Sequence, residues 1–395
     1  MLKLSKYPIA WNYFRSMKTL THLTVLMANR WFSKSYSEAA GRFLMGCDLL
    51  RDNNHNVQNE RLLLGLKGPE DEPLAIDVAI VGNLSSGKIL LSSSGIHGVE
   101  GYPGSAIQLS VIDNLAKQEP FDSHAVIFIH CMNPYGMAWW RRFNENNVDL
   151  NRNFLRSDQE YTGVPEGYHH IKDFFNPKTP PQKRERMFMF KAMKLILKYG
   201  FNNVKQWVAE GQYEYPRAIQ FGGKELQPGP KLLFDWLDVN LKDATNIWAI
   251  DLHTGLGPSG HDTLLVSANT TEEQYQKLDN MFPKHVESLD PNAGVGYEIV
   301  GDLHQGLEDR YDKIKWISIT QEFGTFKPIK VIRASREENR WTQWGQYDTE
   351  NEAKKHWSRL KMLRTFNPDD STWQQKIISR GNIVFASALA DLITD

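Results

Sequence analysis

Short apolar runs bounded by glycine or polar residues predict the strands of a buried sheet. The first three runs cover residues 75–81, 88–91 and 124–131, and unbroken apolar runs of this length are typical of strands covered on both faces. Between the second and third runs, residues 104–116 carry apolar positions at helical spacing. Strand, helix and strand in this order predict a βαβ unit, and therefore a parallel sheet with helices on its faces.

The same pattern returns after a long interruption. Residues 155–245 contain seven prolines around two helical stretches, near 185–199 and 231–240, and we interpret this segment as a long insertion between core strands. Further strands are expected at residues 246–252, 262–268 and 315–321. The predicted fold class is a three-layer α/β fold, with a mixed and mostly parallel sheet flanked by helices.

Two C-terminal helices have recognisable start signals. Thr349 with Glu352, and Ser371 with Gln374, both match the capping-box pattern. For the domain organisation, we expect a basic N-terminal arm at residues 1–31, followed by one catalytic domain at 32–395 that contains the insertion.

Composition and charge exclude several classes of protein. The 395 residues carry 46 Lys and Arg against 47 Asp and Glu, so the basic excess of a dedicated nucleic-acid binder is absent. No uninterrupted apolar run approaches the roughly 18 residues of a membrane-spanning helix, so we expect no integral membrane association. With only Cys47 and Cys131 present, a metal site would have to use histidine and carboxylate ligands. We expect a cytoplasmic protein; organellar targeting by the basic, acid-poor start is the alternative.

Candidate metal ligands lie at the ends of predicted strands. His97 and Glu100 follow one strand in a glycine-flanked His-x-x-Glu turn, where both side chains can reach one metal ion. His253 ends a later strand, and alternation along that strand places Asp251 on the same face as His253. A His-x-x-Glu pattern alone also fits a histidine at a helix start that bonds to backbone. Three protein ligands with an open fourth position are typical of catalytic zinc.

Further motifs follow in a fixed order. Trp140-Arg141-Arg142, Asp149-Leu150-Asn151-Arg152 and Gln321-Glu322-Phe323-Gly324 stand around Asp251-Leu252-His253. Together with His97-x-x-Glu100, this ordered set resembles the zinc carboxypeptidase superfamily, which includes the digestive carboxypeptidases and, more distantly, the succinylglutamate desuccinylase and aspartoacylase deacylases. The resemblance is greatest to a little-characterised microbial subgroup and covers about residues 32–390.

The resemblance implies a role for each matched residue. His97, Glu100 and His253 would hold one zinc ion per chain, and Glu322 would be the general base. Trp140-Arg141 matches the family's oxyanion-stabilising arginine, although the adjacent Arg142 is an equal candidate. The remaining matches concern substrate and ligand support: Asn151 and Arg152 would bind a substrate carboxylate, Asp149 would orient His97, and Asp251 would support His253.

Some positions leave the match incomplete. The family's mobile tyrosine has no clear counterpart, since Tyr297 and Tyr311 are both only loosely placed. The other histidines considered are interpreted as surface or core residues, because the three-ligand set is already complete: His169, His170, His261 and His304.

The sequence therefore predicts a zinc-dependent hydrolase that cleaves an amide bond next to a free carboxylate, as a carboxypeptidase-like metallopeptidase. Its partner would be a peptide or N-acyl amino acid substrate, with no nucleic acid; the oligomeric state is left open. One alternative is an aspartoacylase- or desuccinylase-like deacylase of N-acyl amino acids, in which the 155–245 insertion caps the cleft. The other is a catalytically inactive binding protein of the same fold.

Overall fold

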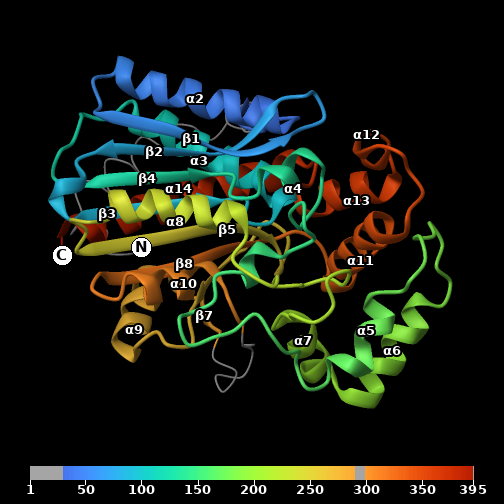
Figure 1. Ribbon diagram of the computed structural model, residues 1–395. Coiled ribbons are helices and arrows are strands. Elements are labelled where there is room, and N and C mark those ends of the chain that lie inside the picture. The colour runs from blue at the N-terminus through green and yellow to red at the C-terminus, as the bar shows by residue number, and fades with distance from the viewer. Residues whose placement is uncertain (1–29, 290–298, 395) are drawn as a thin grey trace.

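An eight-stranded sheet forms the centre of the protein (Figure 1). The computed structural model describes residues 30–289 and 299–394, so the predicted arm at 1–31 lies outside the described residues except for Arg30 and Trp31. The strands are β1 (Val57–Lys67), β2 (Pro73–Gly82), β3 (Lys88–Ser94), β4 (Ala125–His130), β5 (Asn246–Gly255), β6 (Asp262–Val266), β7 (Val286–Ser288) and β8 (Lys315–Gly324).

Helices and short 3-10 turns connect these strands. The helices are α2 (Tyr36–Asp52), α3 (Gly101–Leu115), α4 (Pro134–Ala138), α5 (Tyr168–Phe175), α6 (Phe188–Tyr199), α7 (Phe201–Ala209), α8 (Pro228–Asn240), α9 (Glu272–Met281), α10 (Leu303–Arg310), α11 (Pro328–Trp344), α12 (Glu350–Lys354), α13 (Trp357–Phe366) and α14 (Ser371–Thr394). The 3-10 turns are η3 (Leu84–Ser86), η4 (Gly98–Glu100) and η5 (Leu150–Arg152).

The strand order is β1-β2-β4-β3-β5-β8-β6-β7. The central pairs β4–β3, β3–β5 and β5–β8 are parallel, as is β6–β7 at one edge. The pairs β1–β2, β2–β4 and β6–β8 are antiparallel. The sheet is therefore mixed and mostly parallel, as predicted, and β3, α3 and β4 form the expected βαβ unit.

Helices cover both faces of the sheet. In β4, Val126 and Phe128 face one core, which α2, α3, α9 and α14 complete. The alternate residues Ile127 and Ile129 face a second core, to which α8 and α10 contribute. Burial on both faces explains why the central strands appear in the sequence as unbroken apolar runs and not as alternating patterns.

The segment predicted as an insertion divides into two parts. Its last helix, α8, packs on the sheet through residues such as Leu233 and Leu237. Helices α5, α6 and α7 instead surround a small core of their own that includes Tyr168, Ile171 and Val204. In Figure 1 these three helices lie to one side of the sheet, next to α11.

The C-terminal helix α14 is long and apolar enough, by length and composition alone, to cross a membrane, with a mean hydropathy of 1.3 over its most apolar window. However, 61% of that window is buried inside the protein, where Ile377, Val384 and Leu392 join the core shared with α3. This packing is typical of a core helix. Polar residues interrupt the helix, so the sequence shows no continuous apolar run there.

The start signals of the last helices are met in part. The Thr349 side chain accepts a hydrogen bond from the backbone N–H of Glu352 at the start of α12, as predicted. At α14 the prediction was wrong by one residue, because the Asp370 carboxylate accepts from Trp373 N at 2.8 Å and Ser371 is already helical. The Asp370 carboxylate, one position before the expected serine hydroxyl, caps this turn.

Buried His130 makes the stability of the fold depend on pH. Its ring stacks on Phe43, its Nε2 lies 2.8 Å from Ser105 Oγ, and burial lowers its pKa to about 3. In the unfolded chain an exposed histidine has a pKa of about 6.5. Between these two values only the unfolded state binds the proton, so His130 destabilises the fold progressively as the pH falls.

We therefore expect the free energy of unfolding of wild type, relative to His130→Gln, to fall by up to about 1.4 kcal/mol per pH unit below pH 6.5. Glutamine retains a hydrogen-bonding group for Ser105 but does not titrate. Urea unfolding of both proteins across this pH range measures the difference. Parallel curves would show that His130 does not carry the effect.

Candidate metal centre

Three polar side chains converge at the edge of the sheet where the parallel strands end. His97 follows β3, Glu100 is the last residue of the turn η4, and His253 lies near the end of β5. The turn can hold both His97 and Glu100 because Gly98 lies against Gly136 of α4, where a Cβ atom would come within 2.1 Å of backbone. The glycine next to His97 is thus required by close packing.

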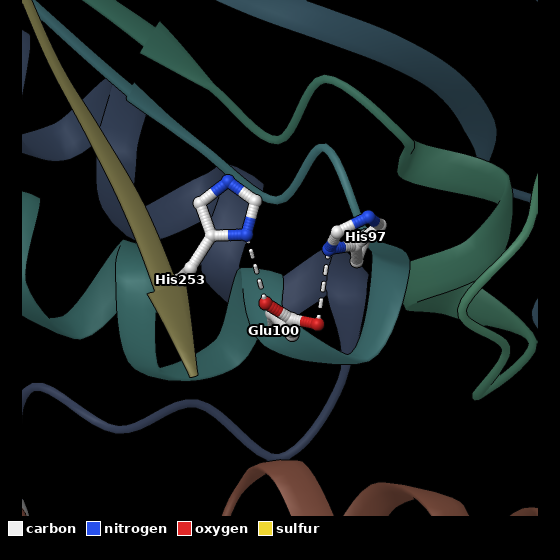
Figure 2. Close-up of side chains that lie close together, drawn as sticks. All are labelled: His97, Glu100 and His253. Atoms are coloured by element: carbon white, nitrogen blue, oxygen red, sulfur yellow. Dashed lines mark ion pairs between the residues drawn. The ribbon is translucent and has the colours of Figure 1, made fainter. Parts of the chain in front are cut away.

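The three side chains face one another (Figure 2). Glu100 lies between the two rings: its Oε1 is 3.1 Å from Nδ1 of His97, and its Oε2 is 3.3 Å from Nδ1 of His253. One ligand atom from each residue lies within 4.8 Å of the other two, and all three residues are buried. The structure therefore brings the three predicted ligands into one cluster that could hold a metal ion.

A second carboxylate holds the far side of each histidine. Asp149 Oδ1 lies 3.0 Å from Nε2 of His97, and Asp251 Oδ2 lies 2.6 Å from Nε2 of His253. Asp251 is fixed in turn by the Ser93 hydroxyl, which donates to its Oδ1 at 2.7 Å. A ring that donates from Nε2 to a carboxylate presents the lone pair of Nδ1, and both Nδ1 atoms face Glu100.

Of the two candidate arginines, the structure brings Arg142 to the cluster. Its guanidinium donates to Glu100 Oε1 at 2.8 Å and to Asp149 Oδ2 at 3.3 Å, and its Nη2 lies 2.8 Å from Nε2 of His97.

Arg141 points elsewhere, so the structure brings Arg142, and not Arg141, to the cluster. The Arg141 guanidinium is buried and donates to Glu338 Oε1, the carbonyl oxygen of Asn144 and the side chain of Asn147. This network joins α11 to the loop after α4.

Glu322 lies beside His253 on the neighbouring strand. The two residues are register partners in the parallel pair β5–β8, and Glu322 Oε1 accepts a hydrogen bond from Leu256 N at 2.8 Å. Burial and the nearby charge of Glu100 raise the pKa of Glu322 to about 7. A carboxyl group in this position can exchange a proton near neutral pH.

Asn151 and Arg152 occupy the turn η5, immediately after Asp149. Asn151 Oδ1 accepts from Leu303 N at 3.0 Å, and no hydrogen bond within the described part of the chain uses its Nδ2. The Arg152 guanidinium donates to the carbonyl oxygens of Ala209 and Asn151. The end of α7 thus covers Arg152, and two of its five N–H donors have no such partner.

Negative charge accumulates in the cluster. Glu100, Asp149, Asp251 and Glu322 are all buried, and the Arg142 guanidinium contacts two of them, Glu100 and Asp149. Burial opposes ionisation of Glu100 and Asp149, but the nearby charges of His97 and Arg142 outweigh it and hold the pKa of both carboxyl groups well below their usual range. Burial also lowers the pKa of His253, but Asp251 and Glu100 outweigh it and raise that pKa above its usual value, so a metal ion that binds Nδ1 would displace a proton.

The residues present fit a divalent metal ion. Two imidazoles and one carboxylate form a ligand set of catalytic zinc sites, His₂Glu. Nδ1 of His97 is buried and makes no hydrogen bond among the described residues, although Glu100 lies close to it. A bound cation would use this lone pair and would offset the buried carboxylates.

A second group of possible ligands lies nearer the surface. His261, Asp262 and His285 also present atoms within 4.8 Å of one another. However, Arg380 already pairs with both oxygens of Asp262, at 2.8 and 3.1 Å. In addition, His261 is exposed and His285 is only half-buried, so this group is less shielded from water than the buried cluster.

The remaining residues considered from sequence make contacts outside the three-residue cluster. His304 Nε2 lies 3.1 Å from the carbonyl oxygen of Ile319, and His170 stacks on Tyr199. Tyr311 precedes β8 and donates from its hydroxyl to Asp238, while Tyr297 lies outside the described residues.

Two neighbours of the site had no signal in the sequence. Thr254 N donates to Glu100 Oε2 at 3.0 Å, and the Phe366 ring lies 5.9 Å from the Arg142 guanidinium carbon. A backbone donor has no residue signature, and Phe366 reaches the site only because α13 packs on Val99. Neither contact could be read from local spacing.

Comparison with known proteins places the chain in a family. The model of a family described as "Protein of unknown function (DUF2817)" matches residues 32–380. The chain belongs to this family. No curated protein matches the chain.

Solved structures show similarity at low identity. The carboxypeptidase A from Helicoverpa armigera is 12% identical, with a TM-score of 0.45, and the match covers 89% of this chain and 74% of that one. An aspartoacylase family protein from Mesorhizobium loti is 16% identical, with a TM-score of 0.37, and the match covers 74% of this chain and 68% of that one. The murein-tripeptide amidase from Escherichia coli O157 is 17% identical, with a TM-score of 0.36, and the match covers 73% of this chain and 93% of that one.

We expect purified protein to hold one zinc ion per chain, and His97→Ala or His253→Ala to lose it, because two remaining ligands bind a divalent ion poorly. Elemental analysis after gel filtration measures the stoichiometry. His261→Ala is the matched control and should keep its zinc. Full zinc retention in both ligand variants, or loss in the control alone, would show that the metal binds elsewhere.

Proposed function

We propose that the protein is a zinc-dependent amide hydrolase that acts next to a free carboxylate, as a carboxypeptidase-like peptidase. The observation that carries this proposal is the geometry of the cluster: Nδ1 atoms of His97 and His253 face Glu100, while a carboxylate holds the other nitrogen of each ring. Ligands oriented in this way are typical of sites that hold catalytic zinc.

His97, Glu100 and His253 would hold the zinc ion. When bound there, zinc would supply a Lewis acid that activates water and polarises a carbonyl group. The chain's own residues would do the rest of the chemistry, and two of them lie at the cluster in suitable positions.

Glu322 would move the protons of the reaction. It would accept a proton from the attacking water and then deliver it to the nitrogen that leaves, so one carboxylate serves as base and then as acid. Its position beside His253 on the adjacent strand supports this role. Arg142 would stabilise the negative charge that develops on the carbonyl oxygen, because its guanidinium lies against Glu100 and His97.

Asn151 and Arg152 would bind the substrate carboxylate. The Nδ2 amide of Asn151 and two N–H groups of Arg152 are the donors available for this contact. Because Ala209 covers Arg152, a substrate would reach the guanidinium beside or in place of that carbonyl oxygen.

The position of α7 over Arg152 favours a second candidate function, a deacylase of small N-acyl amino acids. The three ligands have only 1–3% of their surface exposed, and α7 closes over Arg152. A site enclosed in this way excludes long peptides more readily than small acylated amino acids. Hydrolysis of dipeptides, C-terminally amidated peptides and N-acyl amino acids by zinc-loaded protein distinguishes the two candidates.

Glu322→Gln separates an enzyme from an inactive binding protein. Glutamine has nearly the same shape but cannot accept a proton at neutral pH, so kcat should fall by about a hundredfold or more, while zinc content and Tm stay near wild type. The control is Glu308→Gln on α10, which removes another shielded carboxyl group and should leave kcat unchanged. Near-wild-type kcat in folded, zinc-replete Glu322→Gln protein would remove Glu322 from the reaction.

Arg152→Ala tests the anchoring of the substrate carboxylate. Loss of a charged donor should lower kcat/KM for carboxylate-bearing substrates. The expected loss of transition-state stabilisation is about 2–4 kcal/mol. C-terminally amidated analogues should lose little, since they lack the charge that Arg152 binds. Equal losses for both substrate types would indicate that Arg152 only supports the segment around Ala209.

A further inference from the structure

Helix α6 presents a strongly apolar face to solvent. Met189, Phe190, Met193 and Leu197 are between 51% and 80% exposed, and at 3.6 residues per turn they lie on one side of the helix. Met187 and Phe201 extend this face at its two ends; we call these six residues the α6 face. Of the eleven exposed large apolar residues in the described part of the chain, six lie here.

The opposite side of α6 is already packed, so the helix cannot rotate to bury its exposed face. Phe188 is 1% exposed and stacks on Phe174 of α5. Leu195 packs into the small core formed by α5 and α7. Just before α6, Glu185 pairs with Arg336 and Arg340 of α11. A helix with two apolar sides normally packs both of them, and α6 packs only one.

Positive charge borders the α6 face. Lys191, Lys194 and Lys198 form the third side of the helix, and all three are exposed. Three more exposed cations precede the helix: Lys183, Arg184 and Arg186. None of the six forms an ion pair within the described residues, while Glu185, the single acidic residue of this stretch, is held by α11. The whole chain carries a formal charge of only −1, so the cations are concentrated locally.

This charge decides which partner fits the face. A second copy docked face to face would bring the same cations together, which is repulsive. Residues 1–29 contain no Asp or Glu, so they would be repelled as well. An anionic lipid surface satisfies both features, because lipid chains accept the apolar side chains while lysines at the edge reach the negative head groups.

We propose that the α6 face binds the surface of anionic membranes, with α6 lying in the plane of the interface. The group of α5, α6 and α7 lies beside α11 and away from α2 (Figure 1). Docking through α6 therefore leaves the far side of the sheet in water. Binding of this kind is peripheral and reversible, and it becomes weaker as salt screens the head-group charge.

Co-sedimentation of the full chain with vesicles tests the proposal. Vesicles of phosphatidylcholine and phosphatidylglycerol in equal parts should bind the protein, and vesicles of phosphatidylcholine alone should bind it at least about tenfold more weakly. The double variant Met193→Glu/Leu197→Glu should lose at least about tenfold in affinity for the mixed vesicles. Lys191→Gln/Lys194→Gln should lose about tenfold and much of the salt dependence.

Met45→Glu on α2 is the matched control, since Met45 is 70% exposed but lies on another part of the protein; its affinity should equal that of wild type. Equal Tm values would show that every variant is folded. Absence of binding to mixed vesicles, equal binding to neutral vesicles, or wild-type affinity in both α6 variants would each overturn the proposal. A dimer that Met193→Glu/Leu197→Glu dissociates, without vesicle binding, would identify a second copy as the occupant instead.

Discussion

Parallel pairing of β3, β5 and β8 is the constraint on which the site depends. Because the carboxyl ends of these strands meet at one edge, residues far apart in the chain are brought together there: His97 after β3, His253 in β5 and Glu322 in β8. The register is fixed where β5 and β8 end, since there Leu252 and Phe323 face one core while His253 and Glu322 lie on the other side of the sheet. A slip of one residue in β8 would turn Glu322 into that apolar core.

Burial of several carboxyl groups at this edge follows from the same geometry and has an electrostatic cost. Arg142, held against Glu100 and Asp149, supplies part of the compensating charge. Removal of carboxylates from water is unfavourable unless nearby charges and hydrogen bonds offset it, and a divalent cation between His97, Glu100 and His253 would complete the compensation. The Asp149–His97 and Asp251–His253 contacts serve the same arrangement by fixing the orientation of each ring.

Helices outside the sheet cover this edge. Helix α13 packs Met362 and Phe366 on Val99, next to Glu100, and the end of α7 bonds to Arg152. Helix α11 connects these two helices. Its Arg336 and Arg340 pair with Glu185, just before α6, and its apolar residues pack directly on α13. The segments that enclose the site are thus packed on one another, and α6 occupies the outer side of the same assembly.

The sequence by itself determined six of the eight strands, the βαβ unit and the three clustered residues His97, Glu100 and His253, because burial on both faces leaves unbroken apolar runs and because strand ends carry the polar motifs. The edge strands β1 and β7 were not predicted. Local spacing could not separate Arg141 from Arg142, since two adjacent guanidiniums differ only in which partners tertiary packing offers: Glu338 for one, Glu100 for the other. The cover over Arg152 and the exposed side of α6 were also decided by the tertiary structure. An apolar helix has the same pattern whether one side or all sides are packed, and only its neighbours in space determine which side remains in water.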